Sequence, residues 1–306
     1  MDDLVRRWQH GWGLCRGIAS ARELAVGAPA QEQAGEAAGD RAEPEQRGDT
    51  DLGRHWASGR DGAQGLGRAL GRDGALGLGR APGFAGAPGS GGAPGLGGAL
   101  EVRLGLPGRE WEVFLLGDDP AVIEWFAGRA GVATWVTVTT HRENEVAAQL
   151  TRLGLGLFPE WKLLMSIGLR DHPDAAAASE YRVERTTSGA LDYVRILAAE
   201  GTVAARGMAA VVGADAVMHD IHTEPAHRRR GLGSVVMAEL ARRAVARGAT
   251  TGLLMATADG AQLYRRLGWS SEAAMLTASG LGAEGTSGLG AAGAEGGDLR
   301  PVLAGR

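Results

Sequence analysis

Residues 221–234 read Ile-His-Thr-Glu-Pro-Ala-His-Arg-Arg-Arg-Gly-Leu-Gly-Ser and decide the fold of this 306-residue chain. The pattern predicts a strand that ends near Thr223, a turn at Pro225, and a glycine-containing loop that opens a long helix. Such a loop directs several backbone N–H groups and the positive end of the helix dipole towards one point. The three arginines at 228–230 add positive charge there. The stretch therefore predicts a binding site for a diphosphate.

The spacing of the glycines indicates which kind of diphosphate. The ATP-binding loop needs a lysine after its second glycine, and the only lysine in the chain is Lys162. The dinucleotide fingerprint needs a third glycine where Val236 stands. The pattern Arg228-x-x-Gly231-x-Gly233 instead resembles the acetyl-coenzyme A (acetyl-CoA) signature Arg/Gln-x-x-Gly-x-Gly/Ala of the GNAT (GCN5-related) N-acetyltransferases. A basic surface turn at a helix start also fits this hexapeptide alone, so its context decides.

The surrounding hundred residues predict the elements of that family in order. The motif Leu263-Tyr264-Arg-Arg-Leu-Gly268-Trp269 resembles the family's helix-ending Leu-Tyr-x-x-x-Gly-Phe, and Asp259 is the expected cap of its helix. The resemblance implies an α/β fold over residues 180–278, with a mixed, mostly antiparallel sheet flanked by helices. The expected strands are Tyr181–Thr187, Leu191–Ala198, Thr202–Val212, Ala216–Thr223, Gly252–Thr257 and Ser271–Thr277, and the expected helices are Ser234–Arg247 and Gly260–Leu267.

The chain departs from the family at one place. Only Ser188, Gly189 and Ala190 separate the first two strands, where the family usually has two helices that often shape the acceptor site.

An upstream segment repeats part of this pattern. Residues 149–154, Gln-Leu-Thr-Arg-Leu-Gly, echo residues 262–268, Gln-Leu-Tyr-Arg-Arg-Leu-Gly, with one residue fewer. A strand at Trp135–Thr140, a helix at Glu143–Leu153 and a strand at Trp161–Ile167 surround the echo. We therefore expect a degenerate, non-catalytic GNAT-like half over residues 100–170, without an Arg/Gly loop. A coincidental strand–helix–strand pattern is the alternative.

The rest of the chain differs in composition. Residues 28–99 and 279–306 are rich in Gly and Ala, and we expect a flexible low-complexity linker and a disordered tail. Residues 1–27 place Leu4, Val5, Trp8 and Trp12 at helical spacing. This spacing predicts an amphipathic helix that docks on the core rather than a membrane anchor.

The bulk composition narrows the class of protein. A net charge of −4 gives no reason for nucleic-acid binding, and the single Cys15 excludes an intrachain disulfide. The chain shows no signal-peptide pattern and no long apolar run, so we expect a cytoplasmic protein without a membrane partner. One lysine among 32 basic residues, with abundant Ala and Gly, suggests a bacterial source. No group of His, Cys, Asp and Glu residues in the sequence has a spacing that predicts a metal site.

The resemblance implies direct transfer of an acetyl group from acetyl-CoA, as co-substrate, to a primary amine of a small molecule or peptide. Gly231 and Gly233 would permit close approach of the phosphates. Tyr264 would act as the general acid that protonates the leaving thiolate; the alternative is a tyrosine packed between helix and sheet. The residues expected to contact the cofactor are Ile221, Thr223, Arg228, Arg229, Arg230, Gly231, Leu232, Gly233 and Ser234.

His219 is the candidate general base. Strand alternation places it on one face with Ile221, and relatives with a base on this strand carry it on that face. Histidine ordinarily titrates near neutral pH, which suits proton removal through a water. A structural histidine is the alternative, and His227 is expected to be a solvated turn residue. Two other functions stay open: a catalytically inactive acyl-CoA-binding sensor or scaffold, and a structural partner-binding protein.

Overall fold

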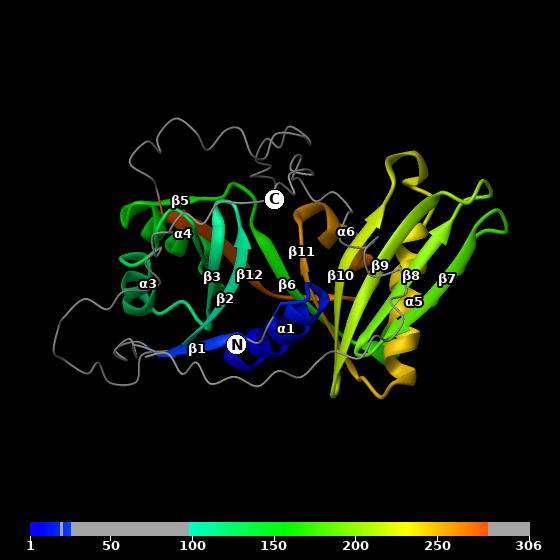
Figure 1. Cartoon of the computed structure of the whole chain (residues 1–306), viewed down its shortest axis with the longest axis horizontal. Coiled ribbons are helices and arrows are strands. Elements are labelled where there is room, and N and C mark those ends of the chain that lie inside the picture. Colours follow the sequence, from blue (N-terminus) through cyan, green and yellow to red (C-terminus); the bar gives the residue numbers. More distant parts are fainter. Residues whose placement is uncertain (19–20, 26–97, 281–306) are drawn as a thin grey trace, which may run out of the picture. The chain divides into compact units, whose positions relative to one another are not determined.

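The computed structural model describes residues 1–18, 21–25 and 98–280. Its strands form one mostly antiparallel sheet in the order β1-β2-β3-β4-β12-β6-β11-β10-β9-β8-β7, with β5 paired to β12 (Figure 1). The described strands are β1 (Arg22–Ala25), β2 (Gly98–Leu106), β3 (Arg109–Leu115), β4 (Thr134–Thr140), β5 (Leu155–Leu157), β6 (Lys162–Gly168), β7 (Arg182–Ser188), β8 (Leu191–Leu197), β9 (Val203–Val212), β10 (Asp215–Thr223), β11 (Thr251–Ala256) and β12 (Ser270–Gly280). The described helices are α1 (Asp2–Cys15), α3 (Pro120–Ala127), α4 (Glu143–Arg152), α5 (Leu232–Ala246) and α6 (Ala258–Arg266), with short 3-10 helices η1 (Leu169–Asp171) and η2 (Pro225–His227).

Two segments of the described chain have the same order of elements. The first runs β2-β3-α3-β4-α4-β6 when the short β5 is set aside, and the second runs β9-β10-α5-β11-α6-β12. In each, the first two strands are antiparallel and a helix leads to a third strand parallel to the second. The repeat of strand, helix and strand expected around residues 149–154 is therefore present, with α4 matching α6 and β6 matching β12.

The two halves exchange their last strands. β6 of the first half lies between β11 and β12 of the second, and β12 lies between β4 and β6. Each half thus supplies a strand that the sheet of the other half needs, so the strands of one half alone do not form a continuous sheet.

α1 packs on the sheet face opposite α5 and α6, as the apolar spacing of residues 1–27 predicts. Val5, Trp8 and Trp12 are buried in one cluster with Val217 of β10 and strands of the first half. The Trp8 and Phe114 rings meet edge to face, with centroids 5.5 Å apart. The other face is covered by α5 and α6, whose apolar side chains form a separate cluster. Side chains of β10 alternate between these two cores.

The expected element boundaries need small corrections. Gly98 belongs to β2 and Ser279 belongs to β12, because pairing with neighbouring strands extends past the low-complexity boundaries. The helix cap is Thr257, whose hydroxyl accepts a hydrogen bond from the Gly260 amide at 3.1 Å, and Asp259 lies in the first turn instead. The remaining low-complexity residues, 28–97 and 281–306, lie outside the described residues.

The second half opens with a tight hairpin. β7 and β8 pair directly from Ser188 to Leu191, and Gly189 turns the chain with a φ of 57°. The two helices expected of the family at this place are therefore absent from the described chain between β7 and β8.

Candidate functional site

The loop before α5 carries a row of unpaired backbone amides. Arg229 and Gly231 have left-handed conformations, with φ of 64° and 77°. Within the described residues, no amide from Arg229 to Gly233 donates a hydrogen bond, whereas the Ser234 amide donates to the Gly231 carbonyl at 3.0 Å. Left-handed residues in a turn gather N–H groups on one concave side, and the helix terminus adds partial positive charge. This geometry suits an anion.

Three arginine side chains surround these amides without a described carboxylate partner. Arg228, Arg229 and Arg230 are all exposed. Nε of Arg228 donates to the Thr223 carbonyl at 3.2 Å, and Nη1 of Arg230 donates to the Tyr181 hydroxyl at 3.2 Å. Both acceptors are neutral, so these contacts leave the positive charge of the loop uncompensated.

Tyr181 anchors the loop, although nothing in its sequence context singles it out. Its hydroxyl accepts from Arg230 and lies 3.1 Å from Nδ1 of His227. His227 is therefore held against Tyr181 and is not the solvated turn residue that the sequence suggests. The two residues are 46 positions apart, and only the packing of β7 beside the loop brings them together.

The two glycines of the loop motif serve different purposes. Gly231 adopts φ 77°, and a β-carbon there would meet nothing within 4 Å, so the space beside it is open. Gly233 faces α6, where a β-carbon would lie 3.0 Å from Cδ2 of Leu263. The expected role of making room for phosphates thus fits Gly231. At Gly233 the structure shows a helix-packing reason instead.

β10 and β11 separate beside this loop. Their pairing ends at Val217 and Leu253, whereas β11 stays paired with β6 along its whole length. The edge of β10 over residues 218–223 that faces β11 consequently has no partner among the described strands. A free strand edge can hydrogen-bond an extended ligand that contains amides. The expected backbone contacts of Ile221 and Thr223 remain predictions, and this is the edge that would make them.

A β-bulge in β10 overturns the face expected for His219. The register with β9 shifts between His219 and His222, and Asp220 has a φ of 49°. Val217 packs with α1 on one face, and His219 follows it by alternation, whereas Ile221 packs beneath α5 on the other. His219 and Ile221 therefore do not share a face, because the bulge inserts an extra residue between them. The role of His219 as base remains a prediction.

The bulge gathers polar side chains of β10 around an arginine of β9. Nε and Nη2 of Arg206 donate to the Asp220 carboxylate at 2.7 and 3.2 Å. Glu224 lies 3.9 Å from Arg206 and 3.5 Å from Nε2 of His222. The sequence shows the acidic and histidine members of this group, but only the register between β9 and β10 reveals Arg206.

Tyr264 lies on α6 and is almost wholly buried in the core cluster between α6 and the sheet. Only 8% of the residue is exposed, and its ring centroid lies 6.1 Å from that of Trp269. Its hydroxyl has no hydrogen-bond partner among the described residues, and burial raises its pKa above the ordinary tyrosine value. The hydroxyl therefore stays protonated at neutral pH, as a general acid must. The packing also suits the alternative of a structural tyrosine.

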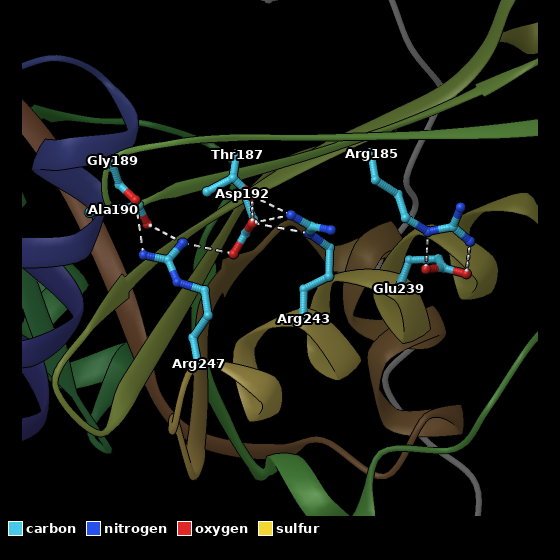
Figure 2. A network of polar contacts seen from close by, with 8 residues as sticks. All are labelled: Arg185, Thr187, Gly189, Ala190, Asp192, Glu239, Arg243 and Arg247. Atoms are coloured by element: carbon cyan, nitrogen blue, oxygen red, sulfur yellow. Dashed lines mark hydrogen bonds and ion pairs between the residues drawn. The ribbon is translucent and has the colours of Figure 1, made fainter.

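A network of ion pairs holds α5, and with it the loop, on the sheet (Figure 2). Asp192 of β8 is fully buried and accepts from Nη2 of Arg243 at 2.7 Å and from Nη1 of Arg247 at 2.9 Å. Burial alone would raise the pKa of Asp192, but these hydrogen bonds outweigh it and lower the pKa. One turn nearer the loop, both Glu239 oxygens accept from Arg185 at 2.7 Å. The network fixes α5 to the β7–β8 hairpin.

The first half has no equivalent anion loop. Its helix α3 begins at Asp119, whose carboxylate already accepts a hydrogen bond from a backbone amide of the helix at 2.8 Å. The adjacent Asp118 pairs with Arg142 at 3.1 Å. β3 and β4 stay paired as far as Leu115 and Val138, so they do not separate. Negative charge at the helix start and a paired strand edge disfavour phosphate binding in this half, and its non-catalytic role stays a prediction.

The described residues contain few other reactive groups. Cys15 lies 3.7 Å from the Val217 carbonyl, and burial raises the pKa of its thiol to about 12, so the thiol is protonated at neutral pH. No described set of three or more His, Cys, Asp or Glu residues is placed to hold a metal ion. No described helix combines the length and the apolar character needed to cross a bilayer.

Comparison with known proteins points to the second half. Residues 204–276, from β9 to β12, match the family model described as FR47-like protein. No curated protein sequence matches the chain. A GCN5-related N-acetyltransferase from Kribbella flavida aligns with 60% of this chain and 87% of its own at 16% identity and a TM-score of 0.47. One from Sphaerobacter thermophilus aligns with 59% and 75% at 13% identity and a TM-score of 0.45. A tandem GNAT protein from the clavulanic acid biosynthesis pathway aligns with 62% and 80% at 13% identity and a TM-score of 0.45. The segment that carries the amide loop and the separated strands is therefore the part of the chain that is similar to the FR47-like family.

Proposed function

We propose that this chain is an acetyl-CoA-dependent N-acetyltransferase that transfers the acetyl group directly to a primary amine. The observation that carries the proposal is the row of unpaired amides from Arg229 to Gly233, beside the separated strands β10 and β11. The loop offers donors and positive charge for a diphosphate, and the strand edge offers backbone groups for the amides of a pantetheine arm. Both features lie next to each other in the second half.

The chain's own residues divide the work in this proposal. Acetyl-CoA supplies an activated acyl group in the form of a thioester. The loop amides and the arginines hold the diphosphate, and the backbone of Ile221 and Thr223 orients the donor. The Tyr264 hydroxyl gives a proton to the departing sulfur, and His219 accepts one from the ammonium of the acceptor through a water.

The burial of Tyr264 favours a second candidate function. Only 8% of Tyr264 is exposed, which restricts the approach of a donor to its hydroxyl, and β11 carries no acid or base between Thr251 and Ala256. A chain with a working loop and no effective proton transfer would be an acyl-CoA-binding sensor or scaffold. That function predicts binding of acetyl-CoA without thiol release for any amine. A structural partner-binding protein predicts no binding of coenzyme A.

Calorimetric titration of the full chain with coenzyme A and acetyl-CoA tests the site. Gly231→Val forces a β-branched residue into φ 77° and disturbs the amide row, so we expect at least about a tenfold loss of affinity. Gly248→Val imposes a comparable strain, at φ 92°, near the opposite end of α5 and serves as the matched control. Equal effects of the two substitutions, or none, would contradict the loop assignment.

A thiol-release assay then tests turnover. Acceptors are amino acids, polyamines, aminoglycosides and peptides with free amino termini. Release of free thiol with at least one of them supports the transferase, whereas tight binding of acetyl-CoA without any release supports the sensor.

A further inference from the structure

Two arginines stand opposite each other on the sheet face away from α5. Val194 and Ile196 of β8 pack beneath α5, so Arg195 between them points to the other face. Arg195 is in register with Arg206 of β9, and Arg206 is in register with His222 of β10. Side chains at such positions are direct neighbours, and like charges there destabilise a sheet.

Among the described residues, a counter-ion is present for only one of the two. Arg206 is held by the Asp220 carboxylate, at 2.7 and 3.2 Å. Arg195 is half-buried and makes no hydrogen bond or ion pair with any described residue. Glu184, the carboxylate in register with it on β7, lies 2.9 Å from Nη1 of Arg182 instead. By contrast, the arginines drawn on the α5 side all have carboxylate partners (Figure 2).

None of the Arg195 guanidinium nitrogens is buried without a partner, so the cation is open to solvent and an anion from outside the chain can reach it. The other end of the same row of side chains is acidic. Glu224, beside His222, is partly exposed and follows the edge of β10 that has separated from β11. Adjacent strands are about 4.8 Å apart, so β8 and β10 are separated by about 10 Å. The row therefore offers a cation at β8 and carboxylates at β10, within the reach of one small zwitterion.

We propose that the acceptor is an amine that also carries a carboxylate, such as an amino acid or a short peptide, and that Arg195 binds this carboxylate. This specificity rests on the proposed function, because it places the ammonium at the β10 end of the row, next to the acyl donor. Glu224 attracts the ammonium there, whereas the Asp220 carboxylate is already held by Arg206. α5 and α6 cover the opposite face, so the acceptor approaches from the side of Arg195.

Matched acceptors test the proposal through thiol release. Amino acids are compared with the corresponding amino-acid amides, with dipeptides and with polyamines. Arg195→Gln should raise KM for acceptors with a carboxylate about 10- to 100-fold, the loss expected for a charge-assisted hydrogen bond, and leave KM for the amides unchanged. Arg195→Lys keeps the charge and should lose less. Arg170→Gln removes an exposed arginine near the far end of β11 and is the control.

Binding measurements separate this proposal from the proposed function. If acetyl-CoA fails to bind the wild-type protein, the transferase assignment fails, and titration with amino acids and their amides alone still examines Arg195. Tighter binding of the carboxylate ligands that is lost in Arg195→Gln supports the site. Equal binding of acids and amides by the wild type, or an equal change in KM for both classes, overturns it. The substitution also relieves a like-charge pair, so the urea midpoint should not fall.

Discussion

A β-carbon on Gly11 of α1 would lie 2.6 Å from Cβ of Val217 in β10. The helix and the strand are therefore in closer contact than any larger residue at position 11 allows. Val217 is also where the pairing of β10 with β11 ends. On the same helix, Nε of Arg7 donates to Asp215 at 2.9 Å, at the start of β10. The N-terminal helix thus supports the strand at the point where the site opens.

Gly11→Ala should destabilise the protein by about 1–3 kcal/mol, because the added methyl group must displace α1 or the strand. Gly13→Ala on the same helix is the matched control, since its β-carbon would make only ordinary contacts, the nearest at 3.8 Å. That control should be neutral or gain up to about 1 kcal/mol from helix propensity. Urea unfolding of both variants measures the difference, and equal stabilities would contradict the close contact.

Asp192→Asn should cost about 3 kcal/mol at neutral pH, because it leaves Arg243 and Arg247 without their buried carboxylate. The pKa of Asp192 is lowered in the fold, so its contribution is present above the ordinary aspartate pKa of about 3.9. The contribution is lost as the pH falls through the lowered value.

The difference in unfolding free energy between wild type and Asp192→Asn should therefore be constant above about pH 5 and shrink at lower pH. Asp259→Asn, at an exposed carboxylate, should change stability by less than about 0.5 kcal/mol. A difference that does not depend on pH would show that Asp192 acts through packing alone.

Tyr264→Phe removes a hydroxyl and little else. If this hydroxyl is the proton donor, turnover should fall about 10²- to 10⁴-fold with unchanged affinity for acetyl-CoA. Normal turnover of Tyr264→Phe would leave the residue with a packing role only.

Tyr181→Phe should have the complementary effect, since it removes the hydroxyl that holds Arg230 in the loop. The affinity for acetyl-CoA should fall several-fold, which corresponds to the loss of about one hydrogen bond, and turnover should stay normal.

The exchange of β6 and β12 predicts that the halves do not fold separately. A fragment of residues 172–306 lacks β6 and α1, which leaves an apolar edge of β11 and one face of β10 uncovered. It should be aggregated or show no cooperative unfolding by circular dichroism. Co-expression with residues 1–171 should restore a complex that purifies as one species. A cooperative transition of the second fragment alone would contradict this dependence.

The errors of the sequence-based predictions have identifiable causes. The face of His219 was inferred from regular alternation, and a bulge at Asp220 is invisible to that pattern. Thr257, and not Asp259, caps α6. Both are good capping residues, so the sequence alone does not choose between them, and the path of the backbone does. Tyr181 and Arg206 were not anticipated because their partners are supplied by other strands and loops.

By itself, the sequence determined the helices, strands and loops that are specified by patterns of a few neighbouring residues. The loop from Arg228 to Ser234, the helix that follows it and the strands around it depend on glycine, on charge and on apolar periodicity, which act over a few residues. Only the tertiary structure decided the exchange of β6 and β12, the separation of β10 from β11, and the isolation of Arg195 from any described carboxylate. These features depend on which distant strands become neighbours and in which register, and that choice comes from packing of the whole sheet rather than from any one segment.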